Sequence, residues 1–328
     1  MRSHCAVYID AGYLLAAAAT RITGTSLRGG IDVNHERLIS ALAEHAEKNS
    51  GLPLLRVHWY DSARNGVPDP TQQSIGLIPR VKIRLGRIGY DGEQKGVDLR
   101  IGLDLVAHAR NGAVEAIYLV SGDDDLTEAV EEAQAHGVQV TVLAIPNADG
   151  EPHGVSQYLQ RAADGLDLFE STAVDAAVAK KIAPPVLPPP PPITSTGPTP
   201  ATIMKRVAEA ARSVAASPAI PQTATPAPRP APVPIYSSTT GQAPVGIAAF
   251  QYTNLEEKIN KVCGQVLNSW KASASADERL ALSTGKPSIP REIDRALLHD
   301  MSEALGVYDL DDDIRHQLRA MFWAHVDI

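Results

Sequence analysis

The stretch AIYLVSGDDDLTEAVEEAQA, residues 116–135, carries the pattern that decides the fold. An apolar, β-branched run at 116–120 predicts a buried strand, and the acidic turn SGDDD at 121–125 ends it. Apolar residues then recur at helical spacing over 126–135, which predicts a helix. A strand that leads directly into a helix is typical of a parallel sheet covered by helices.

The same pattern repeats through the first half of the chain. Apolar runs predict further strands at 5–9, 54–60, 81–88 and 138–145. Helical patterns lie between them at 34–48, 96–110 and 154–163. This alternation indicates an α/β fold with a mostly parallel sheet buried on both faces. If the strands, numbered along the chain, have the order 3-2-1-4-5, the first and fourth flank the switch point, where open sheets bind ligands.

Acidic residues follow the strands at this edge. Asp10 ends the first strand, Asp123 and Asp125 follow the fourth, and Asp98 begins the helix after the third. Converging carboxylates repel one another unless a cation holds them, and a set of oxygen ligands favours Mg²⁺ or Mn²⁺. Such an ion binds phosphate oxygens and lowers the pKa of a bound water, which suits phosphodiester hydrolysis. Taken singly, each aspartate is also what a helix cap or a turn requires.

These residues resemble a known family. Asp10 after a short apolar strand, KGVD at 95–98 and SGDDD at 121–125 are similar to the NYN domain, a PIN-like ribonuclease family, in its bacterial LabA-like branch. The resemblance covers about residues 3–170. It implies a PIN-like three-layer α/β/α sandwich that hydrolyses RNA. It also implies that the residues that bind Mg²⁺ or Mn²⁺ and catalyse are Asp10, Asp98, Asp123 and Asp125.

One departure from the family concerns the first motif. The family's motif often reads Asp-x-x-Asn, whereas Tyr13 stands here where the Asn is expected. An Asn that would orient metal or substrate is therefore missing.

Four further residues are candidates for contacts with RNA. Arg84 and Arg87 belong to a strand in which basic and apolar residues alternate, so one of its faces is predicted to be positively charged. An edge strand that uses Lys and Arg to resist aggregation explains the same pattern. Lys95 either contacts phosphate or pairs with a nearby acid. Ser121 either helps to position the attacking water, as the resemblance implies, or caps the turn that follows it.

Proline divides the chain of 328 residues. Of its 25 prolines, 17 fall between Pro184 and Pro244, in a segment that cannot bury enough apolar surface to offset its ordering entropy. We expect a nuclease domain at 1–171, a Pro-rich disordered linker at 172–252 and a small all-α domain at 253–328. Apolar residues at helical spacing predict three helices in the last part, with Trp270, Phe322 and Trp323 in its core.

Composition excludes several classes of protein. A net charge of −8 argues against a generally basic protein that coats nucleic acid. The two cysteines, Cys5 and Cys263, cannot build a disulfide scaffold or a zinc-finger array. No apolar run is long enough to span a membrane, so we expect a cytoplasmic protein without a membrane partner. The turn DAGYLL at 10–15 lacks the glycine pattern of dinucleotide-binding folds and the second Asp of haloacid dehalogenase phosphatases.

The sequence therefore predicts a Mg²⁺- or Mn²⁺-dependent endoribonuclease whose partner is its RNA substrate. The alternative is a catalytically weak regulatory protein that keeps the acidic site and binds RNA or protein, with the Pro-rich linker or the C-terminal helices as docking elements. Whether the chain forms a homodimer stays open.

Overall fold

The computed structural model describes residues 3–88, 94–183, 254–307 and 310–326. The described residues on both sides of the gap at 184–253 belong to one compact unit. A central sheet and its covering helices lie on the N-terminal side of this gap, and four helices lie on its C-terminal side. Within these ranges, no helix has both the length and the apolar character needed to cross a membrane.

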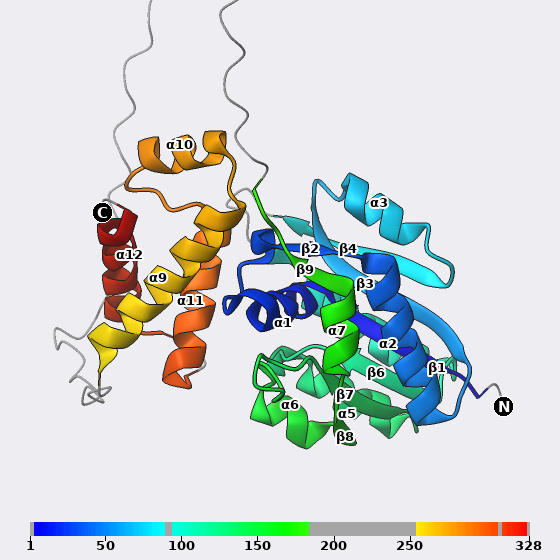
Figure 1. Ribbon diagram of the computed structural model, residues 1–328. Helices are drawn as coiled ribbons and strands as arrows, with labels where there is room; N and C mark the ends of the chain where they lie inside the picture. The colour runs from blue at the N-terminus through cyan, green and yellow to red at the C-terminus, as the bar shows by residue number, and fades with distance from the viewer. Residues whose placement is uncertain (1–2, 89–93, 184–253, 308–309, 327–328) are drawn as a thin grey trace, which may run out of the picture. The chain divides into compact units, whose positions relative to one another are not determined.

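The central sheet has the strand order β5-β4-β3-β1-β6-β7-β8 (Figure 1). Its strands are β1 (Cys5–Asp10), β3 (Leu54–Arg64), β4 (Val81–Ile88), β5 (Gln94–Lys95), β6 (Ala116–Val120), β7 (Gln139–Ala144) and β8 (Gly165–Leu168). Neighbouring strands are parallel except β4 and β5. The five strands predicted from sequence are β1, β3, β4, β6 and β7, and their predicted order is confirmed. Strand β1 lies between β3 and β6, at the switch point.

Helices bury both faces of this sheet. One apolar core contains residues of α1 (Ala11–Thr23), α2 (His35–Ser50) and α7 (Ser171–Ala177). The other contains residues of α4 (Val97–Arg110), α5 (Thr127–Ala135) and α6 (Gln157–Ala162). Side chains of β1 alternate between them, since Val7 and Ile9 enter the first core and Tyr8 enters the second. The predicted α/β/α layering is confirmed.

Several elements were not predicted from sequence. They are α1, β5, β8, α3 (Pro70–Gly76), the 3₁₀ turns η1 (Arg28–Gly30) and η2 (Asp124–Leu126), and an antiparallel pair formed by β2 (Ile31–Val33) and β9 (Val178–Lys180). Residues 172–180, which the sequence assigned to the linker, complete α7 and form β9. The linker from residue 184 onward lies outside the described residues.

The C-terminal part is all helix, as expected. Its helices are α9 (Leu255–Ser273), α10 (Ala276–Thr284), α11 (Arg291–Leu305) and α12 (Asp312–Val326). The structure adds α10 to the three predicted helices. Phe322 and Trp323 are buried in the shared apolar core and Trp270 packs against it, in agreement with the prediction.

The segment between α1 and β2 joins the α/β part to the apolar core of the C-terminal helices. Leu27 is 1% exposed and packs into the core of the C-terminal helices. The backbone N–H of Ser26 donates to Asp300 Oδ1 of α11 at 3.0 Å. The N–H of Ala183 donates to the carbonyl of Ala272 in α9 at 2.9 Å. The C-terminal helices therefore pack on the α/β domain within one unit.

Candidate active site

Asp10 occupies the switch point. It is the last residue of β1 and the N-cap of α1, and its Oδ1 accepts a hydrogen bond from Gly12 N at 2.8 Å. A helix N-terminus stabilises a negative charge at this position. A side chain at position 12 would crowd this carboxylate, because a Cβ on Gly12 would lie 3.0 Å from Asp10 Oδ1 and 3.6 Å from Arg28 Nη2. The sequence thus fixes this carboxylate at the end of the central strand.

The acidic turn after β6 carries Asp123 and Asp125. Asp123 caps η2 by accepting a hydrogen bond on Oδ1 from Asp125 N at 3.0 Å. Ser121 is fully buried, and its Oγ accepts from Asp123 N at 3.3 Å. Ser121 therefore makes the turn-capping contact, one of the two alternatives that the sequence left open, and a role in positioning water stays a prediction.

A glycine in this turn is required by a close backbone approach. A Cβ on Gly122 would lie 1.9 Å from the carbonyl oxygen of Gly154, in the loop between β7 and α6. The carbonyl of Gly122 also accepts a hydrogen bond from Ser156 N at 2.9 Å. The acidic turn and this loop are therefore packed backbone against backbone.

Asp98 reaches the same edge from α4. It lies in the first turn of that helix, after Gly96, whose φ of 80° is one that glycine adopts without strain. Asp98 is half-buried, whereas Asp125 is exposed at the rim.

Burial and neighbouring negative charge raise the pKa of three of these aspartates. Burial raises the pKa of Asp10 to about 6, with a further contribution from the charge of Asp98, and Arg28 partly opposes the shift. Burial and the charge of Asp125 raise the pKa of Asp98. Burial, followed by Asp98 and Asp125, raises the pKa of Asp123. Mutual repulsion of this kind is relieved by a bound cation.

The donor chemistry of these four residues fits a hard divalent ion, because all of their side-chain ligands are carboxylate oxygens. A fifth carboxylate oxygen, Asp124 Oδ1, is buried beside them without a hydrogen-bond partner. The side chains are nevertheless not drawn together into one ligand cluster. Among the described residues, the potential metal ligands that lie within 4.8 Å of one another are side-chain atoms of His153, His299 and Glu303. The four aspartates do not form such a group.

Comparison with known families identifies the family of this chain. The model of the NYN domain matches residues 4–168, which is half of the chain. The chain belongs to the NYN domain family. The NYN domain has a PIN-like nuclease fold, its members are generally ribonucleases, and nucleases of this kind typically use divalent metals.

Two individual proteins resemble this NYN protein. It is 38% identical over 104 residues to the uncharacterized protein y4oD of Sinorhizobium fredii, a match that covers 32% of this chain and 47% of that protein. The chain therefore spans about half the length of that relative. A crystal structure of VPA0982, a protein of unknown function from Vibrio parahaemolyticus, matches 52% of this chain and 94% of its own, with 24% identity and a TM-score of 0.36.

Two residues of this NYN protein that were expected to contact RNA lie on β4. Arg84 forms an ion pair with Asp104 of α4, with its Nε 2.7 Å from Asp104 Oδ2. Tyr60 donates a hydrogen bond to the same carboxylate at 3.0 Å. Arg84 thus has a structural partner that the sequence analysis did not assign. Arg87 is exposed, and it pairs in register with Lys95, whose side chain lies outside the described residues.

Tyr13, at the position of the family's Asn, is tied into the NYN domain. Its hydroxyl donates to the carbonyl of His153 at 2.7 Å and accepts from Ile145 N at 3.3 Å. This side chain therefore anchors the loop between β7 and α6 rather than presenting an amide to the acidic edge.

The sequence analysis missed the arginines near the acidic edge. An open groove of about 1500 Å³ is lined by Gly122 and Asp124 of the acidic turn, and by Arg28, Arg291, Arg295 and Arg315. Burial lowers the pKa of Arg295, and so does the charge of Arg28, while Asp10 raises it. Arg28 and Arg295 therefore share the electrostatic environment of Asp10. They are 267 positions apart in sequence, so no local pattern could have joined them.

Proposed function

We propose that this NYN protein is a Mg²⁺- or Mn²⁺-dependent endoribonuclease. The proposal is carried by one observation: in a nuclease-type fold, Asp10, Asp98 and Asp123 come from three separate elements, are desolvated, and have a raised pKa to which the charge of Asp98 contributes for both Asp10 and Asp123. Desolvated carboxylates that repel one another cost free energy, and a cation that joins them removes this cost.

The aspartates have distinct roles in this proposal. Asp10, Asp98 and Asp123 hold the ion, and the exposed Asp125 completes the set from the rim. The ion supplies a positive charge for phosphate oxygens and lowers the pKa of water in the site. Asp10 stays fixed through its bond from Gly12 N, and Asp123 through its bond from Asp125 N. Hydrolysis in this arrangement would leave 5′-phosphate and 3′-hydroxyl ends.

The substrate class follows from the charges of the groove. An acidic edge alone repels a polyanion, so RNA needs cations close by. Arg28, Arg291 and Arg295 line the same groove as Gly122 and Asp124 of the acidic turn, and we call these three residues the arginine wall of the groove. Guanidinium groups bind phosphate oxygens in a fork, which would hold the backbone while the aspartates act on one linkage.

A second function competes with this one. Tyr13 replaces the family's Asn, and the ligand oxygens of the aspartates do not form a cluster within 4.8 Å in the described conformations. Both observations favour a regulatory protein that binds RNA or a protein partner and cleaves weakly. Under this alternative, the acidic edge retains the ion but turnover is low.

Labelled single-stranded RNA distinguishes the two functions. The full chain is incubated with Mn²⁺ or with a chelator, alongside Asp123→Asn and the control Asp149→Asn, which removes an exposed carboxylate of a different loop. The proposal expects cleavage that requires Mn²⁺, is lost in Asp123→Asn and is kept in Asp149→Asn. Tight RNA binding without cleavage by the wild type supports the regulatory function instead.

A further inference from the structure

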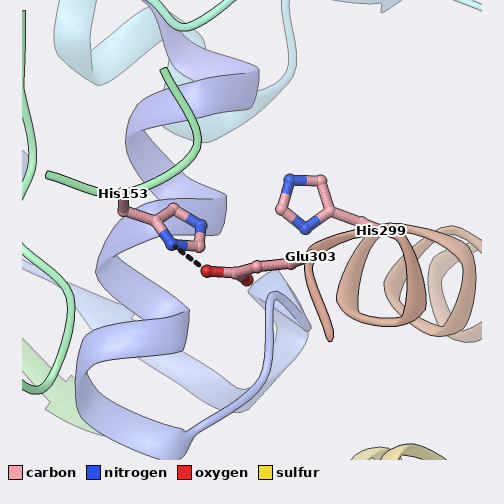
Figure 2. A group of neighbouring side chains, drawn as sticks. All are labelled: His153, His299 and Glu303. Atoms are coloured by element: carbon pink, nitrogen blue, oxygen red, sulfur yellow. Dashed lines mark ion pairs between the residues drawn. The ribbon is translucent and has the colours of Figure 1, made fainter. Parts of the chain in front are cut away.

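A second cluster of metal-ligating side chains lies outside the acidic edge. It is formed by His153, from the loop between β7 and α6, and by His299 and Glu303 of α11 (Figure 2). One ligand atom from each residue lies within 4.8 Å of the other two. His299 and Glu303 are four residues apart, so they occupy one face of the helix.

His153 is buried without satisfying its ring. The residue is 2% exposed, and neither Nδ1 nor Nε2 has a hydrogen-bond partner among the described residues. Its Nδ1 lies 3.1 Å from Glu303 Oε1, close enough for an ion pair, although the two groups are not aligned as a hydrogen bond. An unsatisfied buried polar group costs about 1–3 kcal/mol, so a ligand bound to this imidazole would stabilise the fold.

The backbone around His153 fixes its direction. Its N–H donates to the carbonyl of Ile145 at 3.0 Å, and its carbonyl accepts from the Tyr13 hydroxyl at 2.7 Å. The next residue, Gly154, has a φ of 54° and packs against Gly122. The ring is therefore presented by a braced loop, which favours a preformed site.

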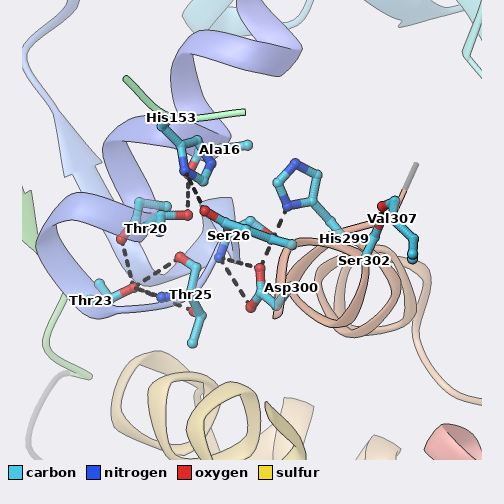
Figure 3. A network of polar contacts seen from close by, with 12 residues as sticks. Ala16, Thr20, Thr23, Thr25, Ser26, His153, His299, Asp300, Ser302 and Val307 are labelled. Carbon is cyan, nitrogen blue, oxygen red and sulfur yellow. Dashed lines mark hydrogen bonds and ion pairs between the residues drawn. The ribbon is translucent and has the colours of Figure 1, made fainter. Parts of the chain in front are cut away.

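The opposite side of the cluster is braced as well. Asp300, between the two α11 ligands, accepts from Ser26 N and lies 3.7 Å from His299 Nδ1 (Figure 3). A carboxylate beside one nitrogen of a ligating histidine orients the ring and increases its basicity. The side chains of His299 and Glu303 are each 42% exposed, which leaves a path for an ion from the groove.

We propose that His153, His299 and Glu303 bind a Zn²⁺ ion that clamps α11 to the NYN domain. Two imidazole nitrogens and one carboxylate oxygen are a ligand set that zinc prefers, with the fourth position left to water. Ligands of a tetrahedral zinc at about 2.0–2.1 Å lie about 3.3 Å from one another. The His153–Glu303 distance of 3.1 Å is already near this value. The all-oxygen aspartate edge suits a harder ion, so the two sites differ in ion class.

The clamp has a structural consequence. His153 follows β7, whereas His299 and Glu303 belong to a helix that also carries Arg291 and Arg295. An ion held by these three ligands fixes the arginine wall of the groove relative to the acidic turn. This inference concerns zinc binding and stands independently of whether the aspartate edge cleaves RNA.

Competition with a chromophoric chelator tests the proposal. The full chain is stripped of metal and titrated with Zn²⁺ in excess Mg²⁺, which occupies oxygen-only sites. We expect one tight equivalent of zinc per chain, and at least about 100-fold weaker binding in His153→Ala, His299→Ala and Glu303→Gln. Zinc should also raise the melting temperature of the wild type but not of His299→Ala.

Two controls separate this site from the others. His316→Ala removes an exposed histidine of α12 and should bind zinc as the wild type does. Asp123→Asn should keep zinc binding whatever happens to RNA cleavage, so failure of one proposal does not imply failure of the other. Because His299 is half-exposed, its alanine variant should fold even if His153→Ala does not.

Cobalt gives an independent spectroscopic readout. Co²⁺ in a tetrahedral site with nitrogen ligands absorbs visible light far more strongly than hexaaqua Co²⁺. We expect this band in the wild type and its loss in His299→Ala. Weak zinc binding by the wild type, or tight binding that His299→Ala leaves unchanged, would overturn the proposal and leave a metal-free His153–Glu303 ion pair in its place.

Discussion

Asp10 shows how one residue connects strand, helix and chemistry. The substitution Asp10→Asn keeps an oxygen that can accept from Gly12 N but removes the negative charge. We expect RNA cleavage to fall at least about 100-fold, equivalent to about 2.7 kcal/mol in the barrier. The folded-state pKa of about 6 lies above the ordinary value, so at pH 7 the charge destabilises the metal-free fold. The melting temperature in chelator should therefore rise, whereas an unfolded variant would indicate a structural role for Asp10.

His58 gives the fold a dependence on pH. It is buried on β3 between aromatic and imidazole rings, with centroids 4.9 Å from Tyr8 and 5.0 Å from His108. Burial, followed by the neighbouring charge of His108 and of Arg84 and Arg56, lowers its pKa to about 4, which Asp104 partly opposes. The folded state thus keeps His58 neutral while the unfolded state gains a proton below about pH 6.5.

The lowered pKa of His58 makes the fold less stable as the pH falls. The stabilisation is complete above about pH 6.5 and is lost as the pH falls toward 4, by roughly 2–3 kcal/mol from His58. Urea unfolding across this range should show the decline in wild type and in His316→Ala, and a flatter profile in His58→Phe. An unchanged slope in His58→Phe would show that other groups cause the decline.

Single residues explain which parts of the site were predictable. Asp10 ends β1 and Asp123 lies in the turn that follows β6, and these two strands are neighbours, so sheet topology alone places both residues at the same edge of the sheet. The contact of Tyr13 with the loop at His153 and the position of Arg28 in the groove depend on tertiary packing. A local sequence pattern does not predict such packing. His153 is a lone histidine in a loop, with its partners about 150 positions away.

At the scale of elements, most of the long helices were predicted, but the 13-residue α1 was not. The helix predicted at 34–48 is α2, where Asn34 accepts a hydrogen bond on its side chain from Arg37 N, and the helix predicted at 96–110 is α4. Two- and three-residue strands such as β5 and β2 have too few residues to show a period. They exist because a neighbouring strand, β4 or β9, offers hydrogen bonds.

Strand β4 was predicted correctly, but the ion-pair partner of its residue Arg84 was not. Alternation placed Arg84 on one face of the strand, but packing of α4 against that face gives it Asp104 as an ion-pair partner. We expect Arg84→Ala to destabilise the fold by about 1–3 kcal/mol, because it leaves the buried Asp104 carboxylate without its cationic partner and with only the Tyr60 hydrogen bond. Urea unfolding measures this, with the exposed Arg87→Ala expected within about 0.5 kcal/mol of wild type. A higher KM for RNA in Arg84→Ala at unchanged stability would restore Arg84 as a substrate-binding residue.

At the scale of the whole molecule, proline content placed the break in the chain between the α/β part and the helical part, and the described residues on both sides of this break belong to one compact unit. It could not show that the C-terminal helices pack on the segment between α1 and β2. That packing depends on few contacts between residues far apart in sequence, such as Ser26 with Asp300. The arginine wall of the groove exists only because of it.

The groove predicts a measurable effect on RNA binding. Arg295→Ala should raise the KM for RNA several-fold with kcat little changed, and should reduce the salt dependence of binding by about one phosphate contact. Arg110→Ala, an exposed arginine at the end of α4, is the matched control and should bind as wild type. Equal losses in both variants would indicate nonspecific attraction instead of a defined contact.

The most direct measurement of the central claim is anomalous diffraction from crystals soaked in Mn²⁺. The account predicts a manganese peak with oxygen ligands from Asp10, Asp98 and Asp123, together with rotation of these side chains toward the ion. The same map from Asp123→Asn crystals should lose or weaken the peak. The account would be contradicted if the wild-type protein cleaves RNA in Mn²⁺ but its soaked crystals show no manganese at these three carboxylates.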